Sequence, residues 1–336
     1  MKKLYRVGIL GATGAVGREM MKILAERNFP LRELRLLASA RSAGTQLTFG
    51  DRMLTVQEAA DDAFDGLDIV LGAAQNAVAK RFAPSIAAAG AVFIDNSSAF
   101  RMDPSVPLVI PEINPDDVQS HHGIIANPNC STIITLTAVN ALNRLSPIVS
   151  MIASTYQAVS GAGTGGPLEL EREVTDLANG RPVQPSVFPY QIAYNVIPQI
   201  GSADIEGYTT EEMKMQNEGR KILHLPQLKV SCTCVRVPVM RSHSISVLVR
   251  TREPITVEQA RMAIDSAPGC RLVDDLENKQ YPMPLDTSEQ DIVCVGRIRP
   301  DLTGDGINLW CCGDQVRKGA ATNAVQIAEL LLKGSF

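Results

Sequence analysis

The first third of the chain alternates between short apolar runs and segments that place hydrophobic residues at helical spacing. Residues 5–10 form one such run, and residues 18–27 follow it with Met20, Met21 and Leu24 on one helical face. Further apolar runs occupy residues 34–39, 68–73, 91–95, 108–110 and 123–126, with a helical segment at residues 79–90. Runs with few polar interruptions are typical of strands buried on both faces, so this alternation predicts an α/β fold with a doubly wound parallel sheet.

The pattern changes after residue 130, where the apolar runs become longer and richer in β-branched residues. The expected strands cover residues 148–159, 228–238, 243–252, 292–298 and 306–312. The expected helices cover residues 133–145, 167–179, 210–224 with Thr210 as the cap, and 315–333. This order favours a mixed or antiparallel sheet in an α+β domain. Residues 181–207 are rich in proline and aromatic residues without periodicity, which suggests a lid or a subunit interface.

Length and composition limit the class of protein. A chain of 336 residues suggests two domains, since a domain commonly holds about 150 residues. Charged residues make up 20% and the net charge is −4 without a basic block, which argues against a nucleic-acid partner. No apolar run approaches the roughly 20 residues that span a bilayer, and no cleavable apolar segment precedes the first expected strand. We therefore expect a cytoplasmic protein without a membrane partner.

The cysteines do not indicate disulfides or metal. Their number, seven, is odd and does not suit a disulfide framework. Cys232-x-Cys234 and Cys311-Cys312 lie in strand-like runs, and no histidine stands at ligand spacing from them. We therefore predict no metal site.

A glycine-rich turn joins the first expected strand to the first expected helix, with the sequence Gly11-Ala12-Thr13-Gly14-Ala15-Val16-Gly17. In dinucleotide-binding folds such a turn lets the backbone approach a pyrophosphate, which the N–H groups at the helix start then bind. The spacing differs from G-x-G-x-x-G, and a purely structural turn is the alternative. Its place between strand and helix favours a Rossmann-type nucleotide site formed by Gly11, Thr13, Gly14, Ala15 and Val16.

The second expected strand runs into Ser39-Ala40-Arg41-Ser42. Sites that prefer NAD commonly carry Asp or Glu here to bind the ribose 2′-hydroxyl, whereas an arginine with neighbouring hydroxyls suits a 2′-phosphate. We therefore expect NADP as the cofactor, bound in part by Ser39, Arg41 and Ser42. A solvated loop arginine is the alternative.

Cys130 stands in the stretch Asn127-Pro128-Asn129-Cys130-Ser131-Thr132, directly before residues compatible with a helix. Pro128 keeps Asn127 out of the helical region, and Asn129 or Ser131 can cap the new helix. A helix N-terminus favours thiolate over thiol, and the thiolate is the nucleophilic form. Taken alone, a packed and unreactive cysteine is an equal alternative.

His243 is the best candidate for a proton-transfer partner among the four histidines. It precedes a β-branched run, whereas His121 and His122 lie in a polar turn and His224 ends an expected helix. A histidine beside a thiol can take its proton and later return it. A structural histidine with satisfied hydrogen bonds is the alternative.

These motifs resemble those of aspartate-β-semialdehyde dehydrogenases, and the resemblance covers essentially the whole chain. The matching segments are residues 11–17, 96–101, 107–114, 127–132, 157–163, 211–214, 236–239 with His243, and 313–315. The resemblance implies a dinucleotide-binding domain over residues 1–127 and an α+β catalytic and dimerisation domain with a mixed sheet over residues 128–314. It also implies a C-terminal helix over residues 315–336 that returns to the first domain, and a homodimer or homotetramer.

The implied activity is the reversible, NADP-dependent interconversion of L-aspartate 4-semialdehyde plus phosphate with 4-aspartyl phosphate. It belongs to the biosynthesis of lysine through diaminopimelate, and of threonine and methionine. Cys130 would attack the aldehyde carbon and carry a thioacyl intermediate, with His243 as acid/base catalyst. Gln157 would hold the intermediate by hydrogen bonds, and Asn129 would help to polarise the carbonyl.

The resemblance also implies the binding residues. Arg236 would pair with the substrate α-carboxylate and Glu211 would lie near its amino group. The expected phosphate ligands are Arg101 and Lys214, with Ser98 close by. The expected neighbours of the cofactor are Ser160 and Gly161 at the nicotinamide, and also Gln315 and Asn323. Without the resemblance, Arg101, Lys214 and Glu211 are ordinary surface charges, and Gln157 and Arg236 are structural strand residues.

Two other functions stay open. A reductase for N-acetylglutamyl phosphate would use the same chemistry, but Arg236 and Glu211 suit a substrate with a free amino acid end. A paralogue that binds dinucleotide without catalysis is the second alternative. The joint presence of Cys130, Gln157, Arg236 and His243 argues against it.

Overall fold

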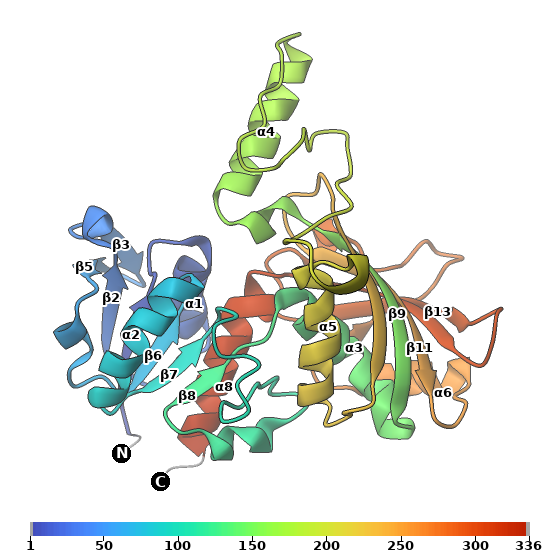
Figure 1. Cartoon of the computed structure of the whole chain (residues 1–336), viewed down its shortest axis with the longest axis horizontal. Helices are drawn as coiled ribbons and strands as arrows, with labels where there is room; N and C mark the ends of the chain where they lie inside the picture. Colours follow the sequence, from blue (N-terminus) through green and yellow to red (C-terminus); the bar gives the residue numbers. More distant parts are fainter. Residues whose placement is uncertain (1–2, 334–336) are drawn as a thin grey trace. The chain divides into compact units, whose positions relative to one another are not determined.

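A computed structural model describes residues 3–333, which form two compact units (Figure 1). The first unit comprises residues 3–129 and 320–333, and the second comprises residues 130–319. The first unit is thus built from two separate stretches of chain. Within residues 3–333, no helix combines the length and the hydrophobicity that crossing a membrane requires. The same residues contain no group of three or more His, Cys, Asp or Glu side chains arranged as metal ligands would be.

The sheet of the first unit confirms the expected doubly wound arrangement. All its neighbouring strands are parallel, in the order β5-β2-β1-β6-β7-β8. The strands are β1 (Tyr5–Leu10), β2 (Leu31–Ala38), β5 (Gln57–Glu58), β6 (Ile69–Gly72), β7 (Val92–Asp95) and β8 (Ile124–Ala126). A separate hairpin is formed by β3 (Gln46–Phe49) and β4 (Arg52–Thr55). The strand order reverses between β1 and β6, which is where open α/β sheets bind ligands.

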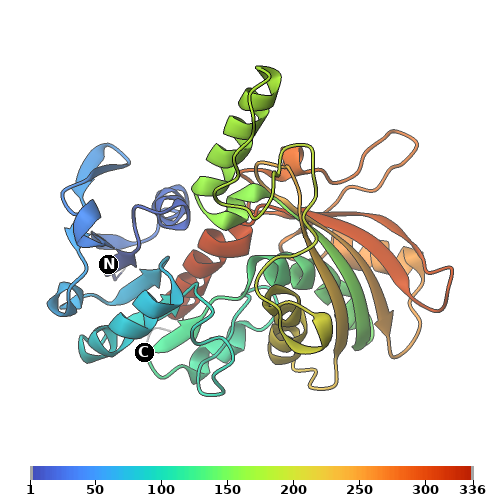
Figure 2. The same ribbon diagram turned by 45° about the horizontal axis from the view of Figure 1, so that its top comes forward.

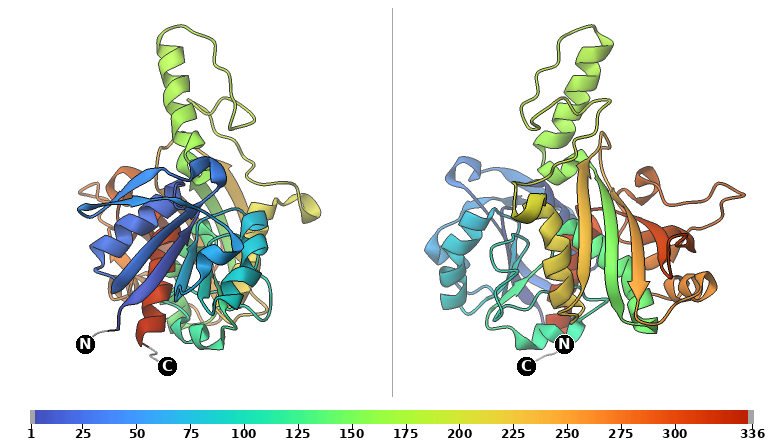
Figure 3. Two further views of the ribbon diagram at one scale, coloured as in Figure 1. Left: turned by 90° about the vertical axis from the view of Figure 1, so that its left-hand side faces the viewer. Right: turned by 45° about the vertical axis from the view of Figure 1, so that its right-hand side comes forward.

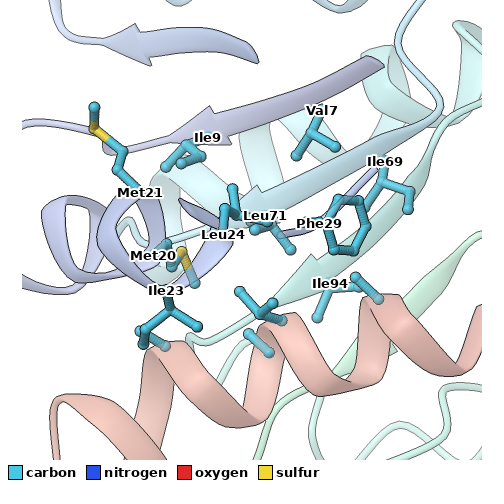
Figure 4. Close-up of a cluster of buried hydrophobic side chains, with 14 of the residues drawn as sticks. Val7, Ile9, Met20, Met21, Ile23, Leu24, Phe29, Ile69, Leu71 and Ile94 are labelled. Atoms are coloured by element: carbon cyan, nitrogen blue, oxygen red, sulfur yellow. The ribbon is translucent and has the colours of Figure 1, made fainter. Parts of the chain in front are cut away.

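Helices cover both faces of this sheet. The long ones are α1 (Ala15–Glu26), α2 (Asn76–Ala88) and α8 (Thr322–Lys333), with short turns at η1 (Ala40–Ser42), η2 (Asp61–Phe64) and η3 (Pro115–Ser120). Figure 4 shows Met20, Ile23 and Leu24 of α1 packed on sheet residues, with α8 beside them. A second apolar cluster joins α2 to the other face. Burying one large aliphatic side chain stabilises a fold by about 1.5–3 kcal/mol, so these two clusters hold the sheet between its helices.

The second unit contains the expected mixed sheet (Figure 3). Its strand order is β10-β9-β11-β14-β13-β12, with parallel pairs at both edges and antiparallel pairs between them. The strands are β9 (Ile148–Gln157), β10 (Lys229–Arg236), β11 (His243–Thr251), β12 (Cys270–Leu272), β13 (Val293–Pro300) and β14 (Ile307–Gly313). Together the two sheets confirm the predicted fold class.

The helices of the second unit lie mainly on one side of its sheet. They are α3 (Cys130–Leu145), α4 (Gly165–Ala178), α5 (Thr210–Ile222), α6 (Val257–Asp265) and α7 (Pro284–Thr287), with short turns at η4 (Val159–Ala162), η5 (Ile205–Gly207) and η6 (Arg317–Ala321). Helix α3 contacts β9, β11, β13 and β14, and its residues 131–142 are all buried. It begins at Cys130, three residues before the expected start at residue 133, and the cysteine lies in the first turn of the helix, as the sequence predicts.

Two predicted helix boundaries were wrong. The cap of α5 is Thr209 and not Thr210, because Thr209 and Glu212 form a reciprocal capping box. The expected helix at residues 315–333 is interrupted, since residues 317–321 form a π-type turn before α8 begins. Such turns insert one extra residue and are frequent near functional sites.

Helix α4 and the following residues 179–200, here called the arm, project from the second unit (Figure 2). Two buried carboxylates of α4 fix the irregular segment. Glu169 accepts hydrogen bonds from the backbone N–H groups of Ser186, Val187 and Phe188, and Glu173 accepts from those of Ile192 and Ala193. The segment therefore has a defined structure although it lacks a regular hydrophobic pattern.

Candidate active site

Three polar side chains lie at one end of the mixed sheet, where adjacent strands begin or end. Strand β9 ends at Gln157, β10 ends at Arg236, and β11 begins at His243. Arg236 pairs with Gln157, and Ser244 pairs with Tyr156, so His243 lies beside Gln157. Directly paired residues present their side chains on the same face of a sheet. The fold thus gathers an amide, a guanidinium and an imidazole from three separate parts of the sequence.

The imidazole of His243 is completely buried and held by the backbone. Its Nδ1 accepts a hydrogen bond from the N–H of Ala158 at 3.0 Å. Its Nε2 makes no hydrogen bond to any residue in the described part of the chain. Burial and the positive charge of Arg236 together lower the pKa of His243 to about 3, although Glu211 opposes the shift. The ring is therefore neutral at physiological pH.

Arg236 is buried next to this ring. One terminal nitrogen, Nη1, donates to the carbonyl oxygen of Ala158 at 2.7 Å, and the guanidinium carbon lies 5.8 Å from the ring centroid of Phe188. Burial lowers the pKa of Arg236, while a negative charge on Cys130 or Glu211 raises it. Arg236 also lines a pocket of about 330 Å³ formed with residues of the arm. A planar cation in such a pocket suits a carboxylate ligand.

Gln157, Glu211 and Lys214 form a chain of contacts from the sheet to helix α5. The side chain of Gln157 accepts a hydrogen bond from Thr155 at 2.9 Å and donates one to Glu211 at 3.3 Å. Glu211 also forms an ion pair with Lys214, with Nζ and Oε2 2.8 Å apart. Glu211 and Lys214 are therefore not independent surface charges, because each is oriented by a neighbour.

Cys130 is the first residue of the second unit, and Gln315 lies close to its last residue. Cys130 is partly exposed, whereas the other six cysteines are buried. A Cβ atom added at Gly319 would lie only 3.0 Å from the Cβ of Cys130, so the close approach requires glycine. Gln315 accepts a hydrogen bond from the N–H of Ser242 at 2.8 Å and donates a short one to Ser160. Gln315 thereby connects the segments on either side of His243.

In the first unit, the glycine turn after β1 has the shape that a pyrophosphate needs. Gly11 has a φ of +92°, and a Cβ there would lie 2.6 Å from the oxygen of Ala73. A Cβ at Gly17 would lie 2.4 Å from the oxygen of Gly11. Helix α1 starts at Ala15, directly after this turn, and no side chain caps it. The N–H groups of its first turn therefore suit an anion, and the residues present fit a dinucleotide.

Further candidate residues follow β2, which neighbours β1 in the sheet, and β7, which lies beyond β6. Ser39 and Arg41 follow β2 and are exposed, and Ser42 is partly buried in the same turn. Ser98 follows β7, where its N–H and hydroxyl bond to the side chain of Asn76 at the start of α2. These positions are at the carboxyl ends of parallel strands, where this class of sheet binds ligands.

Arg101, Asn129 and Asn323 are buried in the first unit. Arg101 donates to the carbonyl oxygens of Asn127 and Asn96 at 2.9 and 2.7 Å. Asn323 donates to Asn127 Oδ1 at 2.7 Å and to the oxygen of Val109 at 3.0 Å. Arg101 and Asn323 therefore both hold the backbone or side chain of Asn127, three residues before Cys130.

The sequence did not point to Ala158, Ser242 or Phe188. Ala158 acts through its backbone amide, which no residue pattern reveals. Ser242 is buried with a φ of +73°, a conformation that serine rarely adopts and that a sequence does not display. Phe188 lies in the irregular arm, so only the three-dimensional structure brings it to Arg236. The proline and aromatic content of residues 181–207 was the one available signal.

Comparison with known proteins gives full-length matches. The family description "semialdehyde dehydrogenase, NAD binding domain" matches residues 6–121, and "semialdehyde dehydrogenase, dimerisation domain" matches residues 140–318. The chain is similar to the aspartate-semialdehyde dehydrogenases of Synechocystis sp. (50% identity over 334 residues) and Bacillus subtilis (47% over 342 residues), with 99% of each chain covered. It also resembles the crystal structure of aspartate semialdehyde dehydrogenase II from Vibrio cholerae, with a TM-score of 0.97, 44% identity and coverage of 99% of this chain and 100% of that one. The Vibrio cholerae enzyme has also been crystallised with ASA.

Proposed function

The chain belongs to the aspartate-semialdehyde dehydrogenase family, and we propose that it interconverts L-aspartate 4-semialdehyde plus phosphate with 4-aspartyl phosphate through a thioacyl intermediate on Cys130. The observation that carries the proposal is the position of a partly exposed cysteine at a helix start, in the same unit as Gln157, Arg236 and His243. The crystals of the Vibrio cholerae relative with ASA support the aldehyde as substrate. We further propose the biosynthesis of lysine, threonine and methionine as its context.

Each side chain has a proposed role that suits its chemical type. The thiolate of Cys130 attacks the aldehyde carbon, and its negative charge is favoured by the start of α3 and by nearby Arg236. Arg236 binds the α-carboxylate and Glu211 the amino group. Gln157 holds the intermediate and Asn129 helps to polarise its carbonyl. His243 is the acid/base catalyst. Lys214, Arg101 and Ser98 bind phosphate.

We propose NADP as the cofactor, which supplies or accepts the hydride when it is bound. The glycine turn with Gly11, Thr13, Gly14, Ala15 and Val16 would hold the pyrophosphate. Ser39, Arg41 and Ser42 would bind the 2′-phosphate, which is supported by the exposed guanidinium of Arg41 after β2. The residues expected to border the nicotinamide or reach the cofactor are Ser160, Gly161, Gln315 and Asn323.

We also propose a homodimer or homotetramer in which a second copy covers the sheet of the second unit. The name of the matching family region, a dimerisation domain, supports this arrangement. Strand β9 presents Ile152 and Tyr156 on the side away from α3, and these residues are 51% and 39% exposed. Apolar side chains gathered on one face commonly mark a protein–protein contact.

The activity is tested with purified protein, aspartate semialdehyde, phosphate and either NADP or NAD. Growth of absorbance at the NADPH band is expected, with N-acetylglutamate semialdehyde as the competing substrate in parallel. Cys130→Ser should abolish turnover and leave NADP affinity nearly unchanged, because the thiol acts after cofactor binding. Turnover retained by this variant would exclude the covalent mechanism, and bound NADP without turnover in the unaltered protein would indicate a non-catalytic paralogue.

A further inference from the structure

A pocket of about 540 Å³, here called the distal pocket, is lined by residues 147–150, residues 224–229 and Arg252. These residues belong to the start of β9, to the turn from α5 into β10, and to the chain just after β11. The candidate active site lies at the other end of the sheet, where β9 ends at Gln157 and β10 ends at Arg236. Pockets that bind small molecules commonly have volumes of about 300–1,000 Å³, so the distal pocket is large enough for an organic ligand.

Much of the distal pocket is lined by apolar side chains. Ile148 and Leu228 line it and are otherwise buried, and Leu225 beside them is partly buried. Pro147 and Pro226 add further carbon surface. An apolar ligand group that covers these side chains is removed from water together with them, which favours binding.

The walls of the distal pocket are fixed by hydrogen bonds of the main chain. The N–H of Leu225 donates to the carbonyl oxygen of Arg220 at 3.0 Å, and the N–H of Leu228 donates to that of Leu225 at 3.0 Å. Arg220 Nε in turn donates to the carbonyl oxygen of Leu228 at 2.8 Å. The N–H of Arg252 donates to the carbonyl oxygen of Pro147 at 2.9 Å. A ligand therefore does not have to order these segments when it binds.

Two cationic side chains line the distal pocket without a carboxylate partner. Lys229 is the first residue of β10, Arg252 follows the last residue of β11, and both are exposed. Within residues 3–333, neither side chain forms an ion pair or a hydrogen bond, and no Asp or Glu lines the pocket. Two unpaired positive charges beside apolar side chains suit a ligand that joins a carboxylate to a carbon framework.

The elements that form the distal pocket also carry residues of the candidate active site. Strand β10 begins with Lys229 and ends at Arg236. Helix α5 packs along β10, has Glu211 in its first turn and leads into the turn that lines the pocket. A Cβ at Gly219 of this helix would lie 3.3 Å from Leu228 Cδ2, so the helix packs closely on a pocket residue. Coupling between two sites is carried by packed, rigid elements of this kind.

We propose that the distal pocket binds a small organic anion and that this anion is an effector of the activity. Its carboxylate accepts hydrogen bonds from Lys229 and Arg252, and its carbon framework lies on Ile148, Leu225 and Leu228. A bound ligand changes the packing at the start of β10 and at the end of α5, and through them the positions of active-site residues. The effector role rests on the proposed function, whereas binding does not depend on it.

The first test is calorimetric titration of the full chain with isophthalate, which joins two carboxylates to an aromatic ring. The uncharged benzamide is titrated in parallel. We expect isophthalate to bind at least tenfold more tightly than benzamide, because only the anion pairs with the two cations. Undetectable binding of isophthalate, or equal affinity for both probes, would overturn the proposal.

Substitutions then locate the charges. Lys229→Ala and Arg252→Ala should each weaken isophthalate binding about fivefold, which is near the upper range for a pair of exposed charges. The double variant should bind about 20-fold more weakly. The matched control is Arg271→Ala, an exposed arginine on β12 of the same sheet that does not line the distal pocket, and it should bind like the unaltered protein. Unchanged affinity in the double variant would place the ligand elsewhere.

The position of the ligand can be read in the unaltered protein by NMR with labelled isoleucine and leucine methyl groups. Titration with isophthalate should shift the methyl signals of Ile148, Leu225 and Leu228. The signal of Leu302, in a turn between β13 and β14, should stay in place. Shifts that leave the three pocket residues unchanged would refute the site even if the variants fail to fold.

The effector role is tested by kinetics with saturating isophthalate, each protein being compared with itself in the absence of the probe. We expect kcat/KM for aspartate semialdehyde to change about fivefold or more in the unaltered protein, since coupling factors are typically about 5–150-fold. An equal change in the double variant would show that isophthalate acts at the active site. Binding without any change in kinetics would exclude an effector. If aspartate semialdehyde is not turned over at all, the proposed function fails, while calorimetry and NMR still decide whether the distal pocket binds the anion.

Discussion

The backbone of a single residue, Ala158, orients two side chains at the end of the mixed sheet. The N–H of Ala158 orients His243, and its carbonyl oxygen orients Arg236. Both contacts come from one residue, so the distance between guanidinium and imidazole is set by the main chain. Substitution at position 158 cannot remove the carbonyl, which makes this arrangement resistant to single changes.

Arg236→Lys should lower kcat/KM by about 100-fold or more, because breaking a buried charge pair costs about 2–5 kcal/mol. Lysine cannot bind Ala158 and a substrate carboxylate with one planar group. Steady-state kinetics with aspartate semialdehyde provide the measurement. The control is Arg250→Lys on β11 of the same sheet, where the partly exposed side chain pairs with Asp301 and activity should be kept. Full activity in Arg236→Lys would remove the carboxylate assignment.

Arg41→Ala should raise KM for NADP about 10–100-fold and leave KM for NAD unchanged, since a hydrogen bond to a charged group contributes about 1.5–3 kcal/mol. The side chain is exposed after β2 and available to a 2′-phosphate. The matched control is Arg52→Ala, an exposed arginine on β4 of the same unit. Equal changes for both cofactors would contradict the 2′-phosphate site.

At the scale of elements, the arm is held by buried carboxylates together with a small apolar cluster that includes Leu170 of α4 and Ile192. Glu169 is 2% exposed and accepts three backbone hydrogen bonds from residues 186–188 as well as one from the Ser186 hydroxyl. This places Phe188 over Arg236 and lets Ile197 pair with Arg236 through two backbone hydrogen bonds of 2.9 Å. An irregular segment thereby forms one wall of the pocket beside Arg236.

Glu169→Gln should destabilise the protein by about 1–3 kcal/mol at pH 7, because an amide cannot accept all of these hydrogen bonds. Burial raises the pKa of Glu169, but the Ser186 hydroxyl and the N–H groups of residues 186–188 outweigh it, so the net shift is downward. A lowered folded-state pKa stabilises the protein above the unfolded value of about 4.3 and ceases to do so as the pH falls through the folded value.

Urea unfolding at pH 7 and in the acid range below about pH 4 tests this dependence. The difference between Glu169→Gln and the unaltered protein should shrink in acid. Glu171→Gln, an exposed neighbour on α4, serves as the control and should unfold like the unaltered protein. A difference that persists unchanged in acid would show that the carboxylate charge is not the cause.

The elements predicted most accurately were those whose signal is local. Buried strands such as β1 and β6, and the start of α3 at Cys130, follow from apolar runs and from the turn chemistry of Pro128. The chain did not reveal β12, the β3–β4 hairpin or the cap at Thr209, because these are short or depend on one hydrogen bond. The meeting of Gln157, Arg236 and His243 depends on sheet register, which only tertiary packing decides. Residue types indicated the chemistry, and the resemblance indicated which residues belong together.

At the scale of the whole molecule, the two units contain different groups of candidate site residues. The first has the glycine turn and the carboxyl ends of a parallel sheet, and the second has the cysteine and the residues around Arg236. In the second unit, helix α3 packs on one side of strand β9. Its other side presents apolar side chains for which a second copy is the proposed partner.

Ile152→Glu should shift the protein from dimer or tetramer towards monomer, because a charged side chain in an apolar contact loses its water without gaining a partner. Ile152 is 51% exposed on β9. Size-exclusion chromatography with light scattering gives the mass. The control is Leu302→Glu, since Leu302 is 95% exposed in a turn between β13 and β14 and should not affect assembly. An unchanged mass for Ile152→Glu would place the interface elsewhere.

Helix α8 comes from the last described residues of the chain, yet Ala324, Val325 and Ile327 are in the same buried cluster as Met20 and Leu24 of α1. Among the elements of residues 3–333, this helix is therefore the last to leave the ribosome. The second unit is complete in sequence while the first unit still lacks part of its core. Until α8 emerges, the sheet face that α1 also covers lacks part of its apolar packing.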